Sequence, residues 1–437
     1  MPNCAKSLDY SKPLTDSEVK FVKSIRPIII LFSLVFLAVN VRADAVSDWH
    51  ALVHTSGAAD GRAPTQSTRI AAMTQIAIHD ALNAINSRYE RYAYYASGNA
   101  NAAAVAAIAA AGYNVLRYEN PTTEFTTQLT LYNAQLASVP DGPDKEAGIA
   151  IGIAAAGAVR SLRANDGLNT ACAPYMAGSA PGEWRPLAGQ SFTTPCWGAN
   201  VAPFTMVSSD RWRPAPRPYF VLTSTKYARE FDEVKRFGSG TSTERTVDQS
   251  EAARFWYPNP PLTWSRFAAD AAADHGFDLW ESARLFALLS VSPADALIAV
   301  WDSKRAYPFW RPVAAIREAD TDGNPATEPD TEWSSYLGTP PYPDYISGHS
   351  GLDGAAAEVF VRVFGTDEAD FTSTTTLPPF GSTTRSFASF SGAAKDGAES
   401  RIWAGIHFRP ACEDALQMGQ RVSRQAVNHY LRPLDEF

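Results

Sequence analysis

The sequence predicts an all-α fold, and three observations support this fold class. Apolar residues recur at helical spacing along much of the chain, and the clearest segments are 101–118, 144–163, 226–237, 242–256, 264–275, 277–290 and 352–364. Pro, Gly or Asn residues bound several of these segments, as is usual at helix ends. No stretch shows sustained period-two alternation with Asn-Gly or Asp-Gly turns, so we do not expect a large sheet.

A helix boundary is predicted inside the apolar part of the chain that begins at residue 277. The segment 277–290 is expected to form one helix, and Ser292-Pro293-Ala294-Asp295 has the pattern of a new helix start. Ser292 would be the N-cap, Pro293 the first helical residue and Asp295 an acidic residue in the first turn.

Two long irregular segments are predicted between the helices. Residues 165–218 are rich in Pro, Gly and Trp and are too many for an ordinary connection. We expect them to wrap the surface between an N-terminal helical half, 44–218, and a C-terminal helical half, 219–437. Residues 320–345 are rich in Asp, Thr and Pro. Their first five residues, 320–324, are similar to a calcium loop, but the spacing to a downstream Glu is wrong, so a solvent-exposed loop is expected.

Composition excludes several classes of protein. Of the 437 residues, 45% are hydrophobic and 19% charged, which is typical of a globular protein and not of a disordered one. The 38 basic and 46 acidic residues give a net charge of −8, which argues against a nucleic-acid binder. Any anion site must therefore be a local cluster of positive charge.

The N-terminus has the features of a secretory signal. Basic residues at 20, 23 and 26 precede an apolar run at 28–39, and Val41-Arg42-Ala43 places small residues at −3 and −1. We expect cleavage after Ala43 and a secreted or periplasmic protein without a membrane span; an uncleaved signal anchor is the alternative. The long flank before the run also allows a start at Val19 or Val22.

Removal of residues 1–43 would leave three cysteines. In an oxidising compartment Cys172 and Cys196 are the expected disulfide pair, closing a loop rich in Pro and Gly. The alternative is that these two residues and Cys412 are all buried thiols.

Three short segments in the last third of the chain carry chemically suitable residues. The first contains Lys304, Arg311 and Pro312, the second is Ser347-Gly348-His349, and the third contains Ser400, Arg401 and His407. A tetrahedral oxyanion needs several donors from different directions and enough positive charge to neutralise it. The lysine supplies a point charge, the arginines supply planar forks, and a loop that enters a helix at Gly348 offers backbone N–H groups. One histidine can bond to the central atom while the other moves protons.

Each segment alone is common in proteins. Lys304 and Arg311 by themselves would be interpreted as solvated helix charges. His349-Ser350 suggests a serine hydrolase, but Gly348-His349-Ser350-Gly351 is one residue short of Gly-x-Ser-x-Gly and no strand precedes it. The order and the internal spacings of the three segments together favour an oxyanion site.

The chain resembles the superfamily of vanadium-dependent haloperoxidases and type-2 phosphatidic acid phosphatases. The family pattern is Lys-x6-Arg-Pro, then Pro-Ser-Gly-His, then Ser-Arg-x5-His-x3-Asp, and the three segments match it in order. Residues 69–81 and 233–238 also look like stretches of bacterial secreted haloperoxidase-like proteins. The resemblance implies a helical bundle with long connecting loops, in which vanadate or phosphate occupies one shared site.

The resemblance implies a role for each matching residue. His407 would ligate vanadium, or attack phosphorus in a phosphatase, and His349 would be the acid–base residue. The remaining residues would hold the oxyanion oxygens: Lys304, Arg311, Ser347, Gly348 and Arg401.

Two positions depart from the family pattern. Ile346 stands where the pattern has Pro, which alters the rigidity of the loop. Ala411 stands where the last Asp is expected; in phosphatase-type members that Asp orients the histidine nucleophile. The absence of this Asp weakens the case for a phosphatase, although Glu413 or Asp414 could reach His407 instead.

Two aromatic residues favour the haloperoxidase branch. Trp301 lies one helical turn before Lys304, and chloroperoxidase-type members also carry a Trp there, beside the halide site. Tyr342 lies seven residues before His349, at a position that varies with halide preference in the family.

The sequence therefore predicts a haloperoxidase that uses hydrogen peroxide and halide at a vanadate bound to His407. One alternative is an acid phosphatase that acts on a phosphomonoester through a phosphohistidine. The other is a non-catalytic phosphate-binding protein, although binding alone would require neither histidine.

Overall fold

The computed structural model describes residues 44–59, 63–119, 125–171, 175–191 and 197–434. The predicted signal segment 1–43 and the cysteines Cys172 and Cys196 lie outside the described residues. Signal cleavage and the disulfide therefore stay predictions.

The N-terminal part of the described chain contains five helices. They are α1 (Ala45–Ala59), α2 (Pro64–Ile85), α3 (Ala104–Glu119), α4 (Phe125–Ala137) and α5 (Pro143–Arg163). The predicted segments 101–118 and 144–163 correspond to α3 and α5.

The middle of the chain is more irregular and contains short elements before it becomes helical again. These are α6 (Trp197–Asn200), the 3-10 helix η2 (Pro218–Phe220), α7 (Thr225–Phe237), α8 (Val247–Trp256) and α9 (Pro260–Asp274). The last three correspond to the predicted helices between 226 and 275.

The C-terminal part carries five more helices and a hairpin. They are α10 (Leu279–Ala306), α11 (Pro312–Arg317), the 3-10 helix η3 (Ala319–Thr321), α12 (Gly348–Phe364), β1 (Glu368–Leu377), β2 (Gly381–Ser389), α13 (Phe390–Trp403) and α14 (Arg409–His429). The two strands form an antiparallel pair, and they are the only named strands in the described ranges. The all-α prediction is confirmed.

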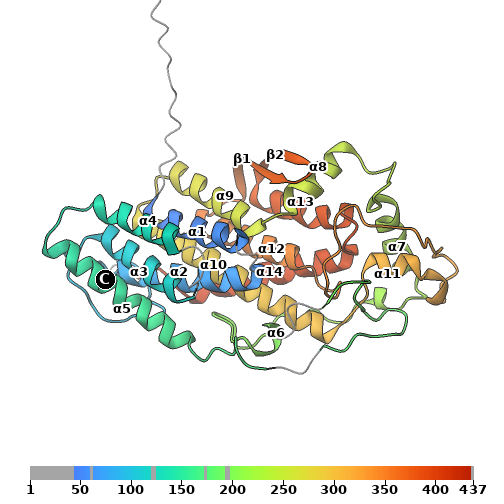
Figure 1. Ribbon diagram of the computed structural model, residues 1–437, viewed down its shortest axis with the longest axis horizontal. Helices are drawn as coiled ribbons and strands as arrows, with labels where there is room; N and C mark the ends of the chain where they lie inside the picture. Colours follow the sequence, from blue (N-terminus) through green and yellow to red (C-terminus); the bar gives the residue numbers. More distant parts are fainter. Residues whose placement is uncertain (1–43, 60–62, 120–124, 172–174, 192–196, 435–437) are drawn as a thin grey trace, which may run out of the picture. The chain divides into compact units, whose positions relative to one another are not determined.

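Helix α10 runs between the two groups of helices. It contacts α1 and α2 on one side and α12 and α14 on the other (Figure 1). An apolar window of α10 would be long enough to span a membrane, but 94% of it is buried inside the protein, as in a core helix. Helices from both predicted halves pack on α10, so these contacts do not separate the two halves. The boundary at 218/219 stays a prediction.

The predicted helix boundary at Ser292 was wrong. Helix α10 continues through Pro293, although this residue cannot donate a backbone hydrogen bond. Ser292, Pro293 and Asp295 are buried, so packing on all sides of α10 outweighs the local cost of the proline.

Asp295 of α10 anchors the wrapping segment instead of starting a helix. Its carboxylate accepts hydrogen bonds from the backbone N–H groups of Phe204, Thr205 and Met206, at 2.6, 2.6 and 3.2 Å. The Thr205 hydroxyl donates a further bond at 2.6 Å. A buried carboxylate with several N–H donors is well satisfied, and these bonds fix the irregular segment on the core.

Helices α12 and α14 approach closely because small residues face one another. A Cβ atom at Gly354 would lie 2.3 Å from the carbonyl oxygen of Leu416, and one at Gly419 would lie 2.1 Å from the carbonyl oxygen of Gly351. Glycine at these positions lets the two backbones touch. The contact sets the start of α12 against the loop that precedes α14.

The loop at residues 320–324 is partly solvent-exposed, as predicted: Asp320, Thr321 and Gly323 are exposed, whereas Asp322 and Asn324 are buried. Asp322 accepts the backbone N–H of Asn324 at 2.7 Å and the hydroxyl of Thr327 at 2.8 Å, and Asn324 donates to the carbonyl of Leu222 at 2.7 Å. The polar side chains tie the loop to its neighbours.

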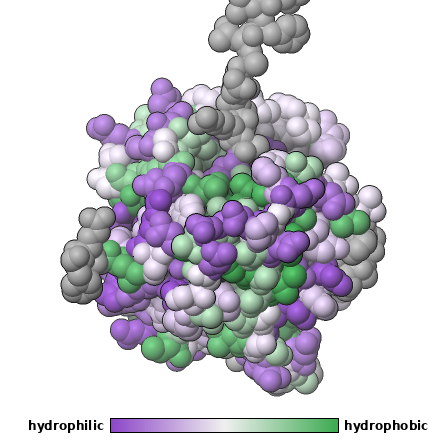
Figure 2. Space-filling model, turned by 90° about the vertical axis from the view of Figure 1, so that its left-hand side faces the viewer, coloured by the Kyte–Doolittle hydropathy of each residue, from purple (hydrophilic) through white to green (hydrophobic). Residues whose placement is uncertain are grey.

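The face on the side of α3, α4 and α5 mixes hydrophilic and hydrophobic residues (Figure 2). Such interspersed surfaces are usual, because folded proteins expose much apolar area.

Candidate oxyanion-binding site

The site is built where several helix ends meet. Lys304 lies in the last turn of α10, and Arg311 is the N-cap residue of α11. Ser347 is the N-cap residue of α12, Arg401 lies in the last turn of α13, and His407 lies in the loop before α14. Residues far apart in sequence thus reach one place because their helices end there.

Contacts confirm that the predicted residues are close together. Arg311 Nη1 lies 3.0 Å from His407 Nε2. The charges of Arg311, Lys304, Arg401 and His349 all act on His407. We call this cluster the oxyanion cage, and it consists of Lys304, Arg311, Ser347, Gly348, His349, Arg401 and His407.

The start of α12 supplies backbone donors to the cage. The Ser347 hydroxyl accepts the backbone N–H of Ser350 at 3.3 Å and the Ser350 hydroxyl at 2.9 Å, which caps the helix. A Cβ built on Gly348 would make only an ordinary contact with Leu297, 3.9 Å away. A helix N-terminus favours an anion.

The cations of the cage are buried. Lys304, Arg311 and Arg401 have 1%, 2% and 0% of their surface exposed. Burial and the neighbouring Arg311 lower the pKa of Lys304 far below its ordinary value, and burial lowers the pKa of Arg401 to about 10. The largest cause of both shifts is burial, which penalises the charged form.

Several polar atoms of the cage have no hydrogen-bond partner among the described residues. Arg311 Nη2, Arg401 Nη1 and His349 Nε2 are buried in this way. The Lys304 ammonium, by contrast, has partners within the protein. Its Nζ donates to the carbonyls of Pro343 and Asp344 at 2.6 and 3.0 Å. Unpaired buried donors are costly, and an oxyanion would satisfy them. The residues therefore fit a tetrahedral oxyanion.

His407 is oriented by a carboxylate that the sequence did not reveal. Its Nδ1 atom lies 2.8 Å from Asp344 Oδ1. If Nδ1–H donates to this carboxylate, Nε2 carries the lone pair that a ligand or nucleophile needs. Burial and the positive charges of Arg311 and Lys304 lower the pKa of His407, which favours the neutral imidazole. Burial raises the pKa of Asp344 to about 7.

Neither acidic residue proposed from the sequence reaches His407. Asp414 pairs with Arg217 and accepts the Tyr345 hydroxyl at 2.7 Å. Glu413 has a half-exposed side chain and lies 3.8 Å from Arg409. The carboxylate beside His407 belongs to Asp344, which precedes the Ser-Gly-His motif by three residues. The family pattern instead places an Asp after His407 in the sequence.

His349 has a neutral ring facing the cage. Burial and the charge of Arg401 lower its pKa well below the ordinary value, while a backbone hydrogen bond with Tyr257 acts in the opposite direction. The Tyr257 ring lies 6.0 Å from the guanidinium carbon of Arg401, and its hydroxyl donates to the carbonyl of Gly338 at 3.1 Å. No motif pointed to Tyr257, because it contacts the site only through the fold.

The two predicted halide-site residues border the cage. The rings of Trp301 and Tyr342 meet edge to face with centroids 4.9 Å apart. The Tyr342 ring lies 5.2 Å from Lys304 Nζ and 5.0 Å from the guanidinium carbon of Arg311. The cage therefore has an aromatic wall beside its cations.

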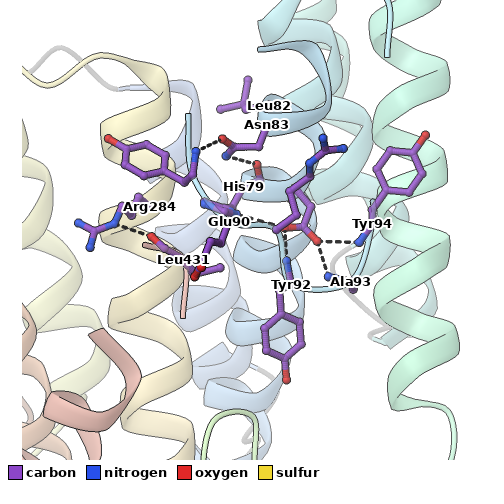
Figure 3. A network of polar contacts seen from close by, with 12 residues as sticks. His79, Leu82, Asn83, Glu90, Tyr92, Ala93, Tyr94, Arg284 and Leu431 are labelled. Carbon is purple, nitrogen blue, oxygen red and sulfur yellow. Dashed lines mark hydrogen bonds and ion pairs between the residues drawn. The ribbon is translucent and has the colours of Figure 1, made fainter. Parts of the chain in front are cut away.

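Four histidines outside the cage pack against neighbouring side chains. His79 is buried in α2 beside Asp80, whose carboxylate accepts the backbone N–H groups of Tyr92, Ala93 and Tyr94 at 2.7–2.9 Å (Figure 3). His50 and His54 are buried in α1 with ring centroids 4.7 Å apart, and His275 stacks on Phe364.

Comparisons with known proteins agree on one family. Residues 284–436 match the family described as the VCPO second helical-bundle domain, a range that contains every residue of the cage. The vanadium chloroperoxidase of Curvularia inaequalis is 35% identical over 91 residues, which are 19% of this chain and only 14% of the fungal enzyme.

Solved structures extend the similarity to most of the chain. A bacterial vanadium-dependent iodoperoxidase has a TM-score of 0.76 and 26% identity, covering 90% of this chain and 97% of its own. Apo-type and holo-type structures of bacterial vanadium-dependent chloroperoxidase have TM-scores of 0.69 and 0.67 at 19% identity. Each covers 83% of this chain and, at that identity, shows the fold alone.

Proposed function

We propose that the chain is a vanadium-dependent haloperoxidase, because its cage residues lie in the range that matches the VCPO second helical-bundle domain and its fold is similar to that of bacterial vanadium-dependent haloperoxidases. The proposed reaction oxidises a halide with hydrogen peroxide, so that X⁻, H₂O₂ and H⁺ give HOX and H₂O. The proposed cofactor is vanadate.

One observation supports the proposal most directly. Arg311 Nη2 and Arg401 Nη1 are buried donors without partners among the described residues, and His407 Nδ1 in the same cage is held by Asp344. This combination suits an oxyanion whose central atom bonds to an imidazole nitrogen. His407 would be the ligand of vanadium, and the other cage residues would hold the oxygens.

Different residues of the cage would bind the oxyanion and move protons. Vanadate, when bound, would supply a Lewis acid that activates peroxide toward halide. Lys304, Arg311 and Arg401 would hold negative charge on the oxyanion and withdraw it from the reacting oxygen. His349, neutral because of burial and Arg401, would accept and return the proton that the balanced reaction moves.

The aromatic wall favours halide as the substrate. Trp301 and Tyr342 offer an apolar surface beside Lys304 and Arg311, where a weakly hydrated anion is attracted without being tightly bound. We propose that iodide and bromide are the halides to examine first, since the iodoperoxidase structure is similar over nearly its whole length.

A phosphatase is the second candidate, and one observation strengthens it. The absence of an Asp after His407 weakens the case for a phosphatase, but Asp344 supplies a carboxylate to the same imidazole. The cage could then stabilise phosphoryl transfer while His407 attacks phosphorus and His349 protonates the leaving oxygen. A protein that only binds phosphate remains the non-catalytic alternative.

A paired assay separates these functions. The chain from Asp44 onward would be incubated with orthovanadate, hydrogen peroxide and iodide or bromide, and halogenation of a phenolic dye would be followed. The same preparation without vanadate would be given a phosphomonoester. We expect halogenation only with vanadate. Phosphate release without halogenation would support the phosphatase, and neither activity with tight phosphate binding would support a binding protein.

Substitution of the two histidines should affect vanadate binding and turnover differently. His407→Ala removes the bond to the central atom and should abolish both vanadate binding and turnover. His349→Ala should retain vanadate, because it removes no positive charge, and should lower turnover by about 10²–10⁴. Vanadate affinity measured by calorimetry and the rate of dye halogenation give the two readouts. Full turnover in His407→Ala would mean that the site is wrongly assigned.

A further inference from the structure

A buried carboxylate lies behind the cage in α12. Asp353 is located one helical turn after His349, and none of its surface is exposed. The indole N–H of Trp264 in α9 donates to Asp353 Oδ1 at 2.8 Å. The second oxygen, Oδ2, has no hydrogen-bond partner among the described residues.

The unpartnered oxygen faces the helix that carries Arg401. A Cβ atom on Gly397 of α13 would lie only 2.4 Å from Asp353 Oδ2, so the carboxylate touches α13 one turn before Arg401. Glycine at this position leaves the room that the carboxylate occupies. The charge of Asp353 is the leading negative charge that acts on Arg401.

Two nitrogens of Arg401 are hydrogen-bonded within the protein, and the third has no partner among the described residues. Its Nε donates to the Ser400 hydroxyl at 2.9 Å, and Ser400 donates to the carbonyl of Gly397 at 2.5 Å. Its Nη2 donates a long bond of 3.4 Å to the carbonyl of Ala253, while Nη1 has no described partner.

We propose that Asp353 acts on the oxyanion through Arg401: its buried carboxylate lies against α13 one turn before Arg401 and, when ionised, offsets part of the charge that the cage offers to an anion. The cage then binds anions more weakly when Asp353 is ionised and more tightly when it is protonated. This inference rests on the proposed anion site and concerns its regulation, but it does not depend on halide chemistry.

The surroundings of Asp353 place its ionisation near neutrality. Burial raises its pKa to about 7, while the Trp264 N–H and the charge of Arg401 lower it and the charge of Asp396 raises it. Arg401 and Asp396 come from α13, and Trp264, which does not titrate, comes from α9. Anion affinity should therefore fall as the pH rises through this range.

The chain offers a matched control in Asp396. Its Oδ2 also accepts an indole N–H, from Trp256 at 2.8 Å, and its carboxylate is paired with Arg385 at 2.8 and 2.9 Å. Asp396 thus has the same kind of tryptophan partner, but its arginine does not belong to the cage.

The experiment measures sulfate binding to the vanadate-free protein by calorimetry between about pH 5.5 and 8.5. Sulfate is a tetrahedral oxyanion whose charge is constant over this range, unlike phosphate or vanadate. Asp353→Asn should bind sulfate about tenfold more tightly than wild type at the upper pH and equally at the lower pH. Asp396→Asn removes a charge that raises the pKa of Asp353, so it should keep the fall in sulfate affinity seen in the wild type, with the midpoint moved to lower pH. Any contribution of Asp344, His349 and His407 to the pH dependence is common to all three proteins, so the difference between profiles isolates Asp353.

A second variant keeps the test valid if Asp353→Asn does not fold. Trp264→Phe removes the N–H that stabilises the ionised carboxylate, so the pKa of Asp353 should rise and the fall in sulfate affinity should move to higher pH. Parallel profiles for wild type and Asp353→Asn, or an unmoved midpoint in Trp264→Phe, would overturn the inference. Absence of sulfate binding in the wild type would overturn it together with the anion site. Sulfate binding as expected without halogenation would refute only the proposed function.

Discussion

At the scale of single residues, Asp344 is the side chain whose removal should affect His407 most. Asp344→Ala takes away the acceptor of His407 Nδ1, so the ring is free to turn and to change tautomer. We expect vanadate affinity to fall by about 10- to 100-fold, the usual effect of losing an orienting partner of a ligating histidine. Equilibrium titration of the variant with orthovanadate measures this change.

The control for Asp344 is the acidic residue that the sequence had offered instead. Glu413→Gln alters a half-exposed side chain 3.8 Å from Arg409 and should leave vanadate affinity within about threefold of wild type. If Glu413→Gln weakened binding as much as Asp344→Ala, the assignment of the orienting carboxylate would be incorrect.

The residues that bind the anion could be predicted from the sequence, whereas those that support them could not. Lys304, Arg311 and His407 lie in short segments whose spacing is itself a signal. Asp344 meets His407 across 63 residues of chain, and Asp353 lies against the helix that carries Arg401 only because α12 and α13 pack together. Such partners leave no local pattern, because any buried carboxylate in the right place can orient a histidine or an arginine.

At the scale of helices, the contact between α12 and α14 should be sensitive to a single methyl group. Gly419→Ala would place a Cβ 2.1 Å from the carbonyl oxygen of Gly351, so the helices must separate. We expect the free energy of unfolding to fall by about 1–3 kcal/mol, as in other overpacked cores. Urea denaturation measures it, and vanadate affinity should fall as well, because α12 starts in the cage.

Gly157 in α5 is a suitable control for this substitution. A Cβ atom there meets nothing within 4 Å, so Gly157→Ala changes only the helix propensity. It should raise the free energy of unfolding by about 0.5–1 kcal/mol. A loss of stability in Gly157→Ala equal to that in Gly419→Ala would show that close helix contact is not the cause.

Helices were predictable where apolar spacing and capping residues agreed, and not where packing decided. The segment 226–237 has a clear amphipathic pattern and forms α7 between Thr225 and Phe237. The wrong boundary at Ser292 followed a sound local rule, but α10 is buried on all sides and gains more from continuous packing than Pro293 costs. Local signals do not reveal how deeply a helix is buried.

At the scale of the whole molecule, binding of an oxyanion should stabilise the fold. The cage concentrates Lys304, Arg311 and Arg401 in the interior of a protein with a net charge of −8. An anion that binds only the folded state adds about 2.7 kcal/mol to the free energy of unfolding at 100 times its Kd. We expect orthovanadate to raise Tm in wild type but not in His407→Ala. Differential scanning calorimetry measures the shift, and an equal shift in both proteins would place the anion elsewhere.

The leader is a second property of the whole chain. We propose that residues 1–43 direct export and that the mature protein begins at Asp44, the first residue that the structure describes. Sequencing the N-terminus of protein recovered from the extracellular or periplasmic fraction should give Asp-Ala-Val. An intact N-terminus in a membrane fraction would instead indicate the signal anchor.

The burial of unpaired donors in the cage implies that the surrounding medium determines which form of the protein is present. Arg311 Nη2 and Arg401 Nη1 would accept phosphate as readily as any oxyanion of the same shape. Competition multiplies the apparent Kd for vanadate by one plus the ratio of phosphate concentration to its own Kd, roughly elevenfold when phosphate is ten times its Kd. In phosphate-rich surroundings more vanadate would therefore be needed to fill the proposed site, and removal of phosphate would lower that amount.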